Sequence, residues 1–269
     1  MVLVFGLFFA GSIINAGEML AGRLPSPGGS WAEFAPAAVQ ELTYAGLAAL
    51  VAILLSARRG MTLRQLGLGL PRQADGTASP GRTTRMGALA LVALIIGAVF
   101  MVRLETGHLA QPAYPTGAYF VYAVAGSLQS GVVEEMIALA FVVTTLRQAR
   151  RPVPEIFIVA VLLRCSYHIY YGVGVIGVAV WATLFVWLFL RYGSIIPLIV
   201  IHFLWDASQF LAEKWPAVGA VASVGVLALL TTAFITWLVE FNRRNAWKTR
   251  PPVSPPPWPV PPPPPAGDH

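Results

Sequence analysis

The chain has 269 residues, of which 57% are hydrophobic and only 11% are charged, and its formal net charge is +6. About a quarter of the residues of a soluble domain are charged, so this chain has too few charges to cover a surface that faces water. The composition therefore excludes an ordinary soluble domain and predicts a single membrane domain. The basic residues lie between apolar runs and form no basic domain, so we expect no nucleic-acid partner.

Eight apolar segments are candidates to cross a bilayer, which takes about 20 mostly apolar residues per helix. In chain order they are 2–21, 36–57, 86–103, 117–146, 153–171, 174–190, 194–212 and 217–240. The first begins MVLVFGLFF, without a basic lead or a small-residue cleavage site, so we interpret it as a membrane helix and not as a removed signal. The expected fold is all-α: a polytopic transmembrane helix bundle of about eight spans.

Basic residues mark one side of this bundle. With eight spans, the basic-rich loops all fall on the same side, which the positive-inside rule assigns to the cytoplasm together with both termini. These loops carry Arg58, Arg59, Arg64, Arg72, Arg82, Arg85, Arg147, Arg150, Arg151, Arg191, Arg243, Arg244, Lys248 and Arg250. We therefore expect an integral protein of a bacterial plasma membrane, with the lipid bilayer as its surroundings.

The chain divides into four parts on this interpretation. Residues 1–57 form N-terminal membrane spans, 58–85 a cytoplasmic loop, 86–240 the membrane core, and 241–269 a proline-rich cytoplasmic tail. The stretch MTLRQLGLGL in the loop is a candidate for a short amphipathic helix at the interface. The tail contains the runs PPP and PPPPP, so we expect it to be disordered, either inert or bound to a partner with an aromatic groove.

Ionisable side chains inside the predicted spans are few and costly, and such residues usually face the bundle interior and mark function. Two of them, Glu18 and Glu41, lie near span ends, where an interfacial role is expected. The others fall on three spans: Glu134, Glu135, Arg164, His168, His202 and Asp206. Arg164 and His168 are four residues apart, as are His202 and Asp206, so each pair is expected on one helix face.

The two glutamates are adjacent, so they differ in direction by about 100° on a helix. One of them should face a shared site and the other elsewhere, toward Arg164 for example. Counted from the cytoplasmic arginines at 1.5 Å per residue, Glu134, His168 and His202 lie roughly 20, 25 and 16 Å deep. One common depth favours a single polar site over separate interhelical hydrogen bonds that only hold the bundle together.

The order and spacing of these residues resemble the CPBP family, the CAAX-type and bacteriocin-processing intramembrane endopeptidases also called abortive-infection proteins. The resemblance covers roughly residues 117–212, and LGLGLP at 66–71 is similar to the segment that often precedes that core. The family's double glutamate corresponds to Glu134 and Glu135, its FxxxH histidine to His168, and its final HxxxN or HxxxB pair to His202 and Asp206 in HFLWD.

Two positions depart from the family pattern. Leu139 stands at the arginine of EExxxR, and Arg164 stands at the phenylalanine of FxxxH. A cation that is missing from one span thus reappears on the next, and we hypothesise that Arg164 takes over an ion pair with Glu135 or with Asp206. The alternative is that the site has decayed and the chain is a non-catalytic descendant.

The resemblance implies peptide hydrolysis without a metal. Glu134 would take a proton from water and deliver it to the leaving amine, and His168 would hold the same water. His202, oriented by Asp206, would stabilise the oxyanion, with Glu135 and Arg164 in support. We therefore expect no cofactor, although Glu134, His168 and His202 are also a possible zinc ligand set.

Two functional interpretations remain open at this level. The first is an endopeptidase that cleaves a peptide or a membrane-protein substrate. The second is a non-enzymatic membrane protein, either an inactive relative acting in immunity or a transporter or proton relay that uses the same buried acids and histidines. The sequence contains neither HExxH nor GxSxG, which disfavours other hydrolase classes.

Overall fold

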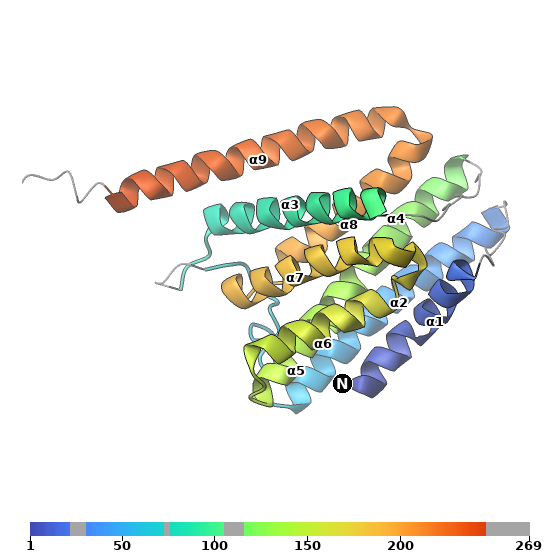
Figure 1. Cartoon of the computed structure of the whole chain (residues 1–269), viewed down its shortest axis with the longest axis horizontal. Coiled ribbons are helices and arrows are strands. Elements are labelled where there is room, and N and C mark those ends of the chain that lie inside the picture. Colours follow the sequence, from blue (N-terminus) through green and yellow to red (C-terminus); the bar gives the residue numbers. More distant parts are fainter. Residues whose placement is uncertain (22–30, 73–75, 105–115, 246–269) are drawn as a thin grey trace, which may run out of the picture.

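The computed structural model describes residues 1–21, 31–72, 76–104 and 116–245, and within these ranges all of the regular elements are helices (Figure 1). The elements are α1 (Val2–Leu20), α2 (Trp31–Arg58), α3 (Pro80–Leu104), α4 (Thr116–Val133), the π-helix η1 (Glu134–Phe141), α5 (Val142–Gln148), α6 (Val153–Ser166), the 3₁₀ helix η2 (Ile169–Gly174), α7 (Val175–Tyr192), α8 (Ile196–Lys214) and α9 (Pro216–Asn245). The expected proline-rich tail lies almost wholly outside the described residues. The all-α bundle predicted from composition is confirmed.

Six of the described helices are long and apolar enough to cross a membrane. They span Val2–Leu20, Phe34–Arg58, Pro80–Leu104, Gly117–Gln148, Ile169–Tyr192 and Pro216–Phe241, and α8 adds a shorter apolar helix at Ile196–Ala212. The remaining segment of the eight predicted is α6, which is only 14 residues long. Each predicted span therefore corresponds to a helix, but the 14-residue α6 is shorter than a full crossing requires.

Large apolar side chains cover the outside of the bundle, as expected of a protein solvated by lipid. Leu3, Leu162, Leu204 and Val221 are among the many exposed hydrophobic residues. An exposed apolar surface of this extent would be a liability in water, whereas helices that satisfy their own backbone hydrogen bonds are stable in hydrocarbon. The chain is thus built as an integral membrane protein.

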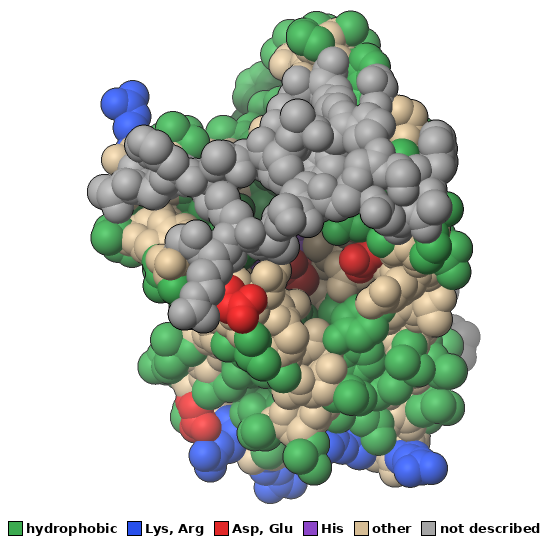
Figure 2. All heavy atoms as spheres, turned by 90° about the vertical axis from the view of Figure 1, so that its right-hand side faces the viewer, with side chains coloured by type: hydrophobic (Ala, Val, Ile, Leu, Met, Phe, Trp, Pro, Cys, Tyr) green, Lys and Arg blue, Asp and Glu red, His purple; other side chains and the backbone are tan. Residues whose placement is uncertain are grey.

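The arginines of the predicted cytoplasmic loops gather at one end of the bundle, here called the basic end. It is defined by the end of α2 at Arg58, the start of α3 near Arg82, the end of α5 at Arg147 and the last turn of α7 at Arg191. The N-terminus lies at this end too (Figure 1). Figure 2 looks onto the opposite end, and most lysine and arginine side chains lie along its lower edge.

Glycine contacts bring the central helices close together. A Cβ at Gly177 of α7 would overlap the carbonyl oxygen of Gly97 in α3, so these backbones touch. A Cβ at Gly131 of α4 would lie 3.2 Å from the backbone of Ile199 and of Phe203 in α8. Small residues permit such approaches between membrane helices, and here they draw α3, α4, α7 and α8 around a shared interior.

The loop after α2 differs from the prediction. The stretch MTLRQLGLGL forms turns and no amphipathic helix, and α3 begins at Pro80, six residues before the predicted start at 86. Gly67 accounts for the turns in this stretch, because its φ of +90° is incompatible with a helix. Its carbonyl oxygen accepts a hydrogen bond from the Ile195 amide at 2.9 Å, which fastens the loop to the junction of α7 and α8.

Candidate active site

The two adjacent glutamates open the π-helix η1, which continues directly from α4. A π-helix has i→i+5 hydrogen bonds and is a rare element that occurs frequently at functional sites. The side chain of Glu134 reaches the wall of a cavity, whereas Glu135 is 0% exposed and is not among the lining residues. The predicted divergence of the two side chains is therefore present, in a widened helical turn.

Arg164, from α6, joins both acids. Its Nη1 lies 2.8 Å from Glu135 Oε1 and 3.2 Å from Glu134 Oε2, and its Nη2 donates to the Glu134 carbonyl oxygen at 3.2 Å. The guanidinium carbon stands 4.6 Å from the centre of the Trp181 ring, a cation–π contact. Arg164 is 2% exposed, so this is a buried ion cluster with excellent hydrogen bonding. Of the two partners suggested by the sequence, Glu135 is the one in contact.

His202 connects the cluster to α8. Its Nδ1 lies 2.8 Å from Glu135 Oε1, and its Nε2 lies 3.5 Å from Asp206 Oδ2, one helical turn along. Ser130 of α4 donates a hydrogen bond to the same Asp206 oxygen at 2.6 Å. Because a carboxylate only accepts, Nδ1 of His202 carries a proton and Nε2 is the atom nearest the cavity acid Asp206.

His168 stands beyond the end of a helix, which corrects the predicted span 153–171. Helix α6 ends at Ser166, and His168 precedes the 3₁₀ helix η2, in which Gly172 adopts a φ of +57°. The Nδ1 of His168 lies 2.9 Å from the carbonyl oxygen of Arg164. A carbonyl can only accept, so Nδ1 carries the proton, and the neutral ring leaves Nε2 as a hydrogen-bond acceptor.

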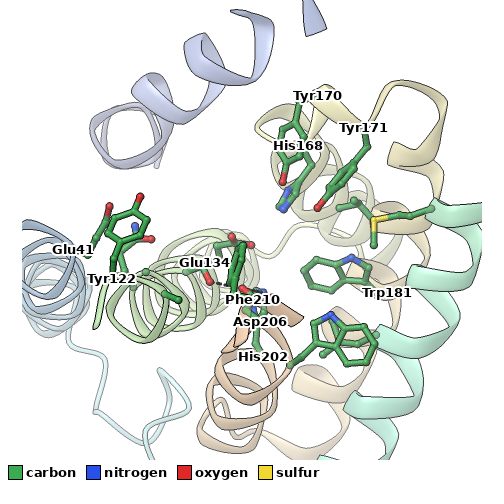
Figure 3. Close-up of a pocket in the computed structure, with 18 of the residues that line it drawn as sticks. Glu41, Tyr122, Glu134, His168, Tyr170, Tyr171, Trp181, His202, Asp206 and Phe210 are labelled. Carbon is green, nitrogen blue, oxygen red and sulfur yellow. Dashed lines mark hydrogen bonds and ion pairs between the residues drawn. The ribbon is translucent and has the colours of Figure 1, made fainter. Parts of the chain in front are cut away.

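A cavity of about 350 Å³ collects the four residues predicted to be catalytic. Glu134, His168, His202 and Asp206 all line it, and Figure 3 shows their side chains around one space bounded by α4, η2 and α8. The supporting residues Glu135 and Arg164 lie behind its wall and are not in its lining. Side chains from three segments far apart in the sequence thus meet at one chamber.

Three residues that contribute to this site were not predicted from the sequence. Tyr167 donates to Glu134 Oε2 at 3.0 Å and packs its ring on Phe9 at a centroid distance of 4.3 Å. Ser130 holds Asp206, and Trp181 covers Arg164. The position of Ser130 one turn before Glu134 was a possible clue, whereas Trp181 is one of eight tryptophans and was indistinguishable from a residue that faces lipid.

The donor atoms suit an ion cluster better than a metal site. Among the described residues there is no group of three or more His, Cys, Asp or Glu placed to hold a metal ion. In the zinc set suggested by the sequence, both ring nitrogens of His202 face carboxylate oxygens, and Oε2 of Glu134 accepts from Tyr167 and Arg164. We therefore derive no step through a metal.

Comparison with known proteins identifies one family. Residues 116–208 match the family model described as Rce1-like, type II CAAX prenyl endopeptidase Rce1-like. No curated protein and no solved structure matches the chain. The matched segment runs from the start of α4 into α8 and contains all six residues of the ion cluster and the predicted catalytic set. The resemblance of this central segment to the CPBP family of CAAX-type intramembrane endopeptidases is therefore confirmed.

Proposed function

We propose that the chain is an intramembrane endopeptidase that hydrolyses a peptide bond with a water molecule activated by Glu134. One observation carries the proposal: Glu134, His168, His202 and Asp206, from three separate segments, line the same cavity. A hydrolase needs a base, a group that holds the water and a donor for the oxyanion within one chamber, and these residue types supply all three.

The contacts of Glu134 suit the role of general base. Both hydrogen bonds described for its carboxylate, from Tyr167 and from Arg164, go to Oε2. Oε1 is then the oxygen that takes a proton from the attacking water and later passes it to the leaving amine. General acid–base catalysis by one positioned side chain contributes about 10²–10⁴-fold to the rate.

His168 and His202 complete the mechanism: the first holds the water, and the second stabilises the substrate carbonyl oxygen. His168 accepts a hydrogen bond from the water at Nε2, because its Nδ1 is engaged with the Arg164 carbonyl. His202 donates from Nε2 to the carbonyl oxygen of the substrate as negative charge develops there, and Asp206 orients the ring. A preorganised donor of this kind is worth about 2.7–4 kcal/mol in the transition state.

The substitution of Leu139 for the family's arginine does not remove the cation from the site. Leu139 is buried at 2% exposure, and Arg164 supplies the positive charge beside Glu135 from α6 instead. This favours an intact site over a decayed one. A proton relay would use the same acids and histidines, and the cleavage assay below distinguishes it from a hydrolase.

The test compares wild type with Glu134→Gln and His168→Ala for cleavage of a peptide mixture in detergent, with products located by mass spectrometry. We expect both variants to lose at least about 99% of the rate. Glu155→Gln is the matched control, because this acid is in an exposed ion pair with Arg151, outside the cavity. Equal cleavage by all four proteins would refute the hydrolase, and inhibition by a chelator would point to a metal.

A further inference from the structure

Resting on the proposed function, we infer that the substrate enters from the end of the bundle opposite the basic end, outside the cytoplasm. We further infer that it is a chain segment with no carboxylate near the cleaved bond, such as a part of an exported peptide or the outer flank of a membrane protein. The placement of the cavity along each helix carries the first statement, and its charge carries the second.

The cavity occupies one half of every helix that lines it. On α4 its lining residues run from Tyr119 to Ser130, it reaches Glu134 at the start of η1, and no later residue of that span takes part. On α8 the lining begins at His202 and ends at Phe210, and on α3 it reaches Met101 near the helix end. In each case this is the half away from the arginines, and Figure 2, seen from that side, shows acidic side chains within a hollow.

The other half of the bundle is closed by packed apolar side chains. Ile137 of η1, Phe185 of α7 and Leu198 of α8 are each 0% exposed, and they lie between the lining residues and the basic end. A cavity at the basic end itself, around Arg64 and Arg147, shares no lining residue with the catalytic one. Among the described residues, this packing separates the cavity from the basic end and leaves its lining in the far half of the bundle.

The positive-inside rule indicates which side of the membrane the open half of the bundle faces. Loops rich in Arg and Lys remain in the cytoplasm, so the open half of the bundle faces the outer side of the membrane. A substrate that approaches from the cytoplasm would meet the packed apolar half. This separates the chain from any protease whose substrate is a cytoplasmic tail.

The lining also selects against acidic substrates. Among the described residues it contains the carboxyl groups of Glu41, Glu134 and Asp206 and neither lysine nor arginine, and the imidazolium of His202 is already paired with Glu135 and Asp206. Arg164 lies behind the wall and already serves two glutamates. A CAAX motif ends in a free C-terminal carboxylate, which would be repelled here. The aromatic rings that line the cavity suit an apolar or cationic residue instead: Tyr119, Tyr122, Tyr170, Tyr171, Trp205 and Phe210.

Thiol labelling in intact cells tests the side of entry without requiring activity. Cys165 is the single cysteine, so Cys165→Ala provides a background without thiols. Gly126→Cys places a thiol in the cavity at a position where a Cβ meets nothing within 4 Å. Gln148→Cys is the matched control, in the cavity at the basic end. The reagent is a membrane-impermeant maleimide.

We expect the Gly126→Cys protein to be labelled in intact cells at least about tenfold faster than the Gln148→Cys protein, which should react only after permeabilisation. Labelling of Gly126→Cys only after permeabilisation would overturn the proposed side of entry. Failure of that thiol to react in the folded, detergent-solubilised protein, when the unfolded protein does react, would also overturn it.

A pair of peptides tests the charge selection. The two share one sequence with a cleavable bond near the C-terminus, and they end in an amide or in a free carboxylate. We expect the amide to be cleaved about tenfold faster, because like charges repel in a desolvated site, and Glu41→Gln should narrow that ratio. A preference for the free carboxylate would refute the selection, whereas cleavage of neither peptide would count against the hydrolase and leave the labelling result intact.

Discussion

Arg164 and Glu135 form a fully buried ion pair, with Nη1 and Oε1 2.8 Å apart, between α6 and the π-helix η1. Glu135 Oε1 also accepts from His202 Nδ1 at 2.8 Å. One carboxylate oxygen thus connects the two helices that carry Arg164 and His202 to the helix that carries the proposed base. The predictions below follow from this arrangement.

Removal of the buried cation should destabilise the protein strongly. Arg164→Leu leaves Glu134 and Glu135 without the cation that they share, with only His202 and Tyr167 still in contact with them, and breaking a buried pair in this way costs about 3–5 kcal/mol. The measurement is the midpoint of thermal unfolding in detergent. Arg151→Leu is the matched control, since its pair with Glu155 is exposed and worth about 0–1 kcal/mol. Similar decreases in the unfolding midpoint of the two variants would show that the buried ion pair contributes no more to stability than the exposed one.

Restoring the family pattern at positions 139 and 164 together should recover the stability that Leu139→Arg alone removes. Leu139→Arg buries a second cation in η1, at a position 2% exposed, and should lower the unfolding midpoint. Leu139→Arg combined with Arg164→Phe moves the positive charge back to the helix of the glutamates. We expect the double variant to be more stable than the sum of the two single effects predicts, by more than about 1 kcal/mol in the free energy of unfolding. Additive effects would mean that the two positions are independent.

Tyr167→Phe isolates one hydrogen bond to the proposed base. The hydroxyl donates to Glu134 Oε2 at 3.0 Å, while the ring keeps its stacking on Phe9. A hydrogen bond to a charged group is worth about 1.5–3 kcal/mol, so kcat should fall about ten- to a hundredfold. Steady-state kinetics should show an unchanged KM, and thermal unfolding should show a lower midpoint, because the same buried hydrogen bond also stabilises the fold. A loss confined to KM would place Tyr167 in substrate binding.

The contact between α3 and α7 should tolerate no added methyl group. Gly177→Ala would make a Cβ overlap the Gly97 carbonyl oxygen, so the helices must separate, at a cost of about 1–3 kcal/mol. Gly46→Ala in α2 is the control, because a Cβ there meets nothing within 4 Å and alanine favours a helix. Equal unfolding midpoints for the two variants would contradict the close packing described here.

The apolar runs and the arginines were sufficient to predict the bundle. Twenty-residue hydrophobic segments have few alternatives in lipid, where every backbone group must bond within its own helix, so the eight helices fall where the sequence placed them. The same runs did not predict that α6 ends at Ser166, where the His168 ring bonds back to the Arg164 carbonyl oxygen and stacks on Tyr171. Nor did they predict the turns at Gly67, which depend on contact with Ile195.

By itself the sequence determined which residues are costly in a membrane and hence where chemistry is concentrated: Glu134, His168, His202 and Asp206. Burial of an ionisable group is a property of single positions and spacing, so it can be read along the chain. Only the tertiary structure decided that Arg164 pairs with Glu135 and not with Asp206, and that the cavity opens away from the basic end. Those outcomes depend on how helices distant in sequence pack against one another, and the order of residues contains no measure of those distances.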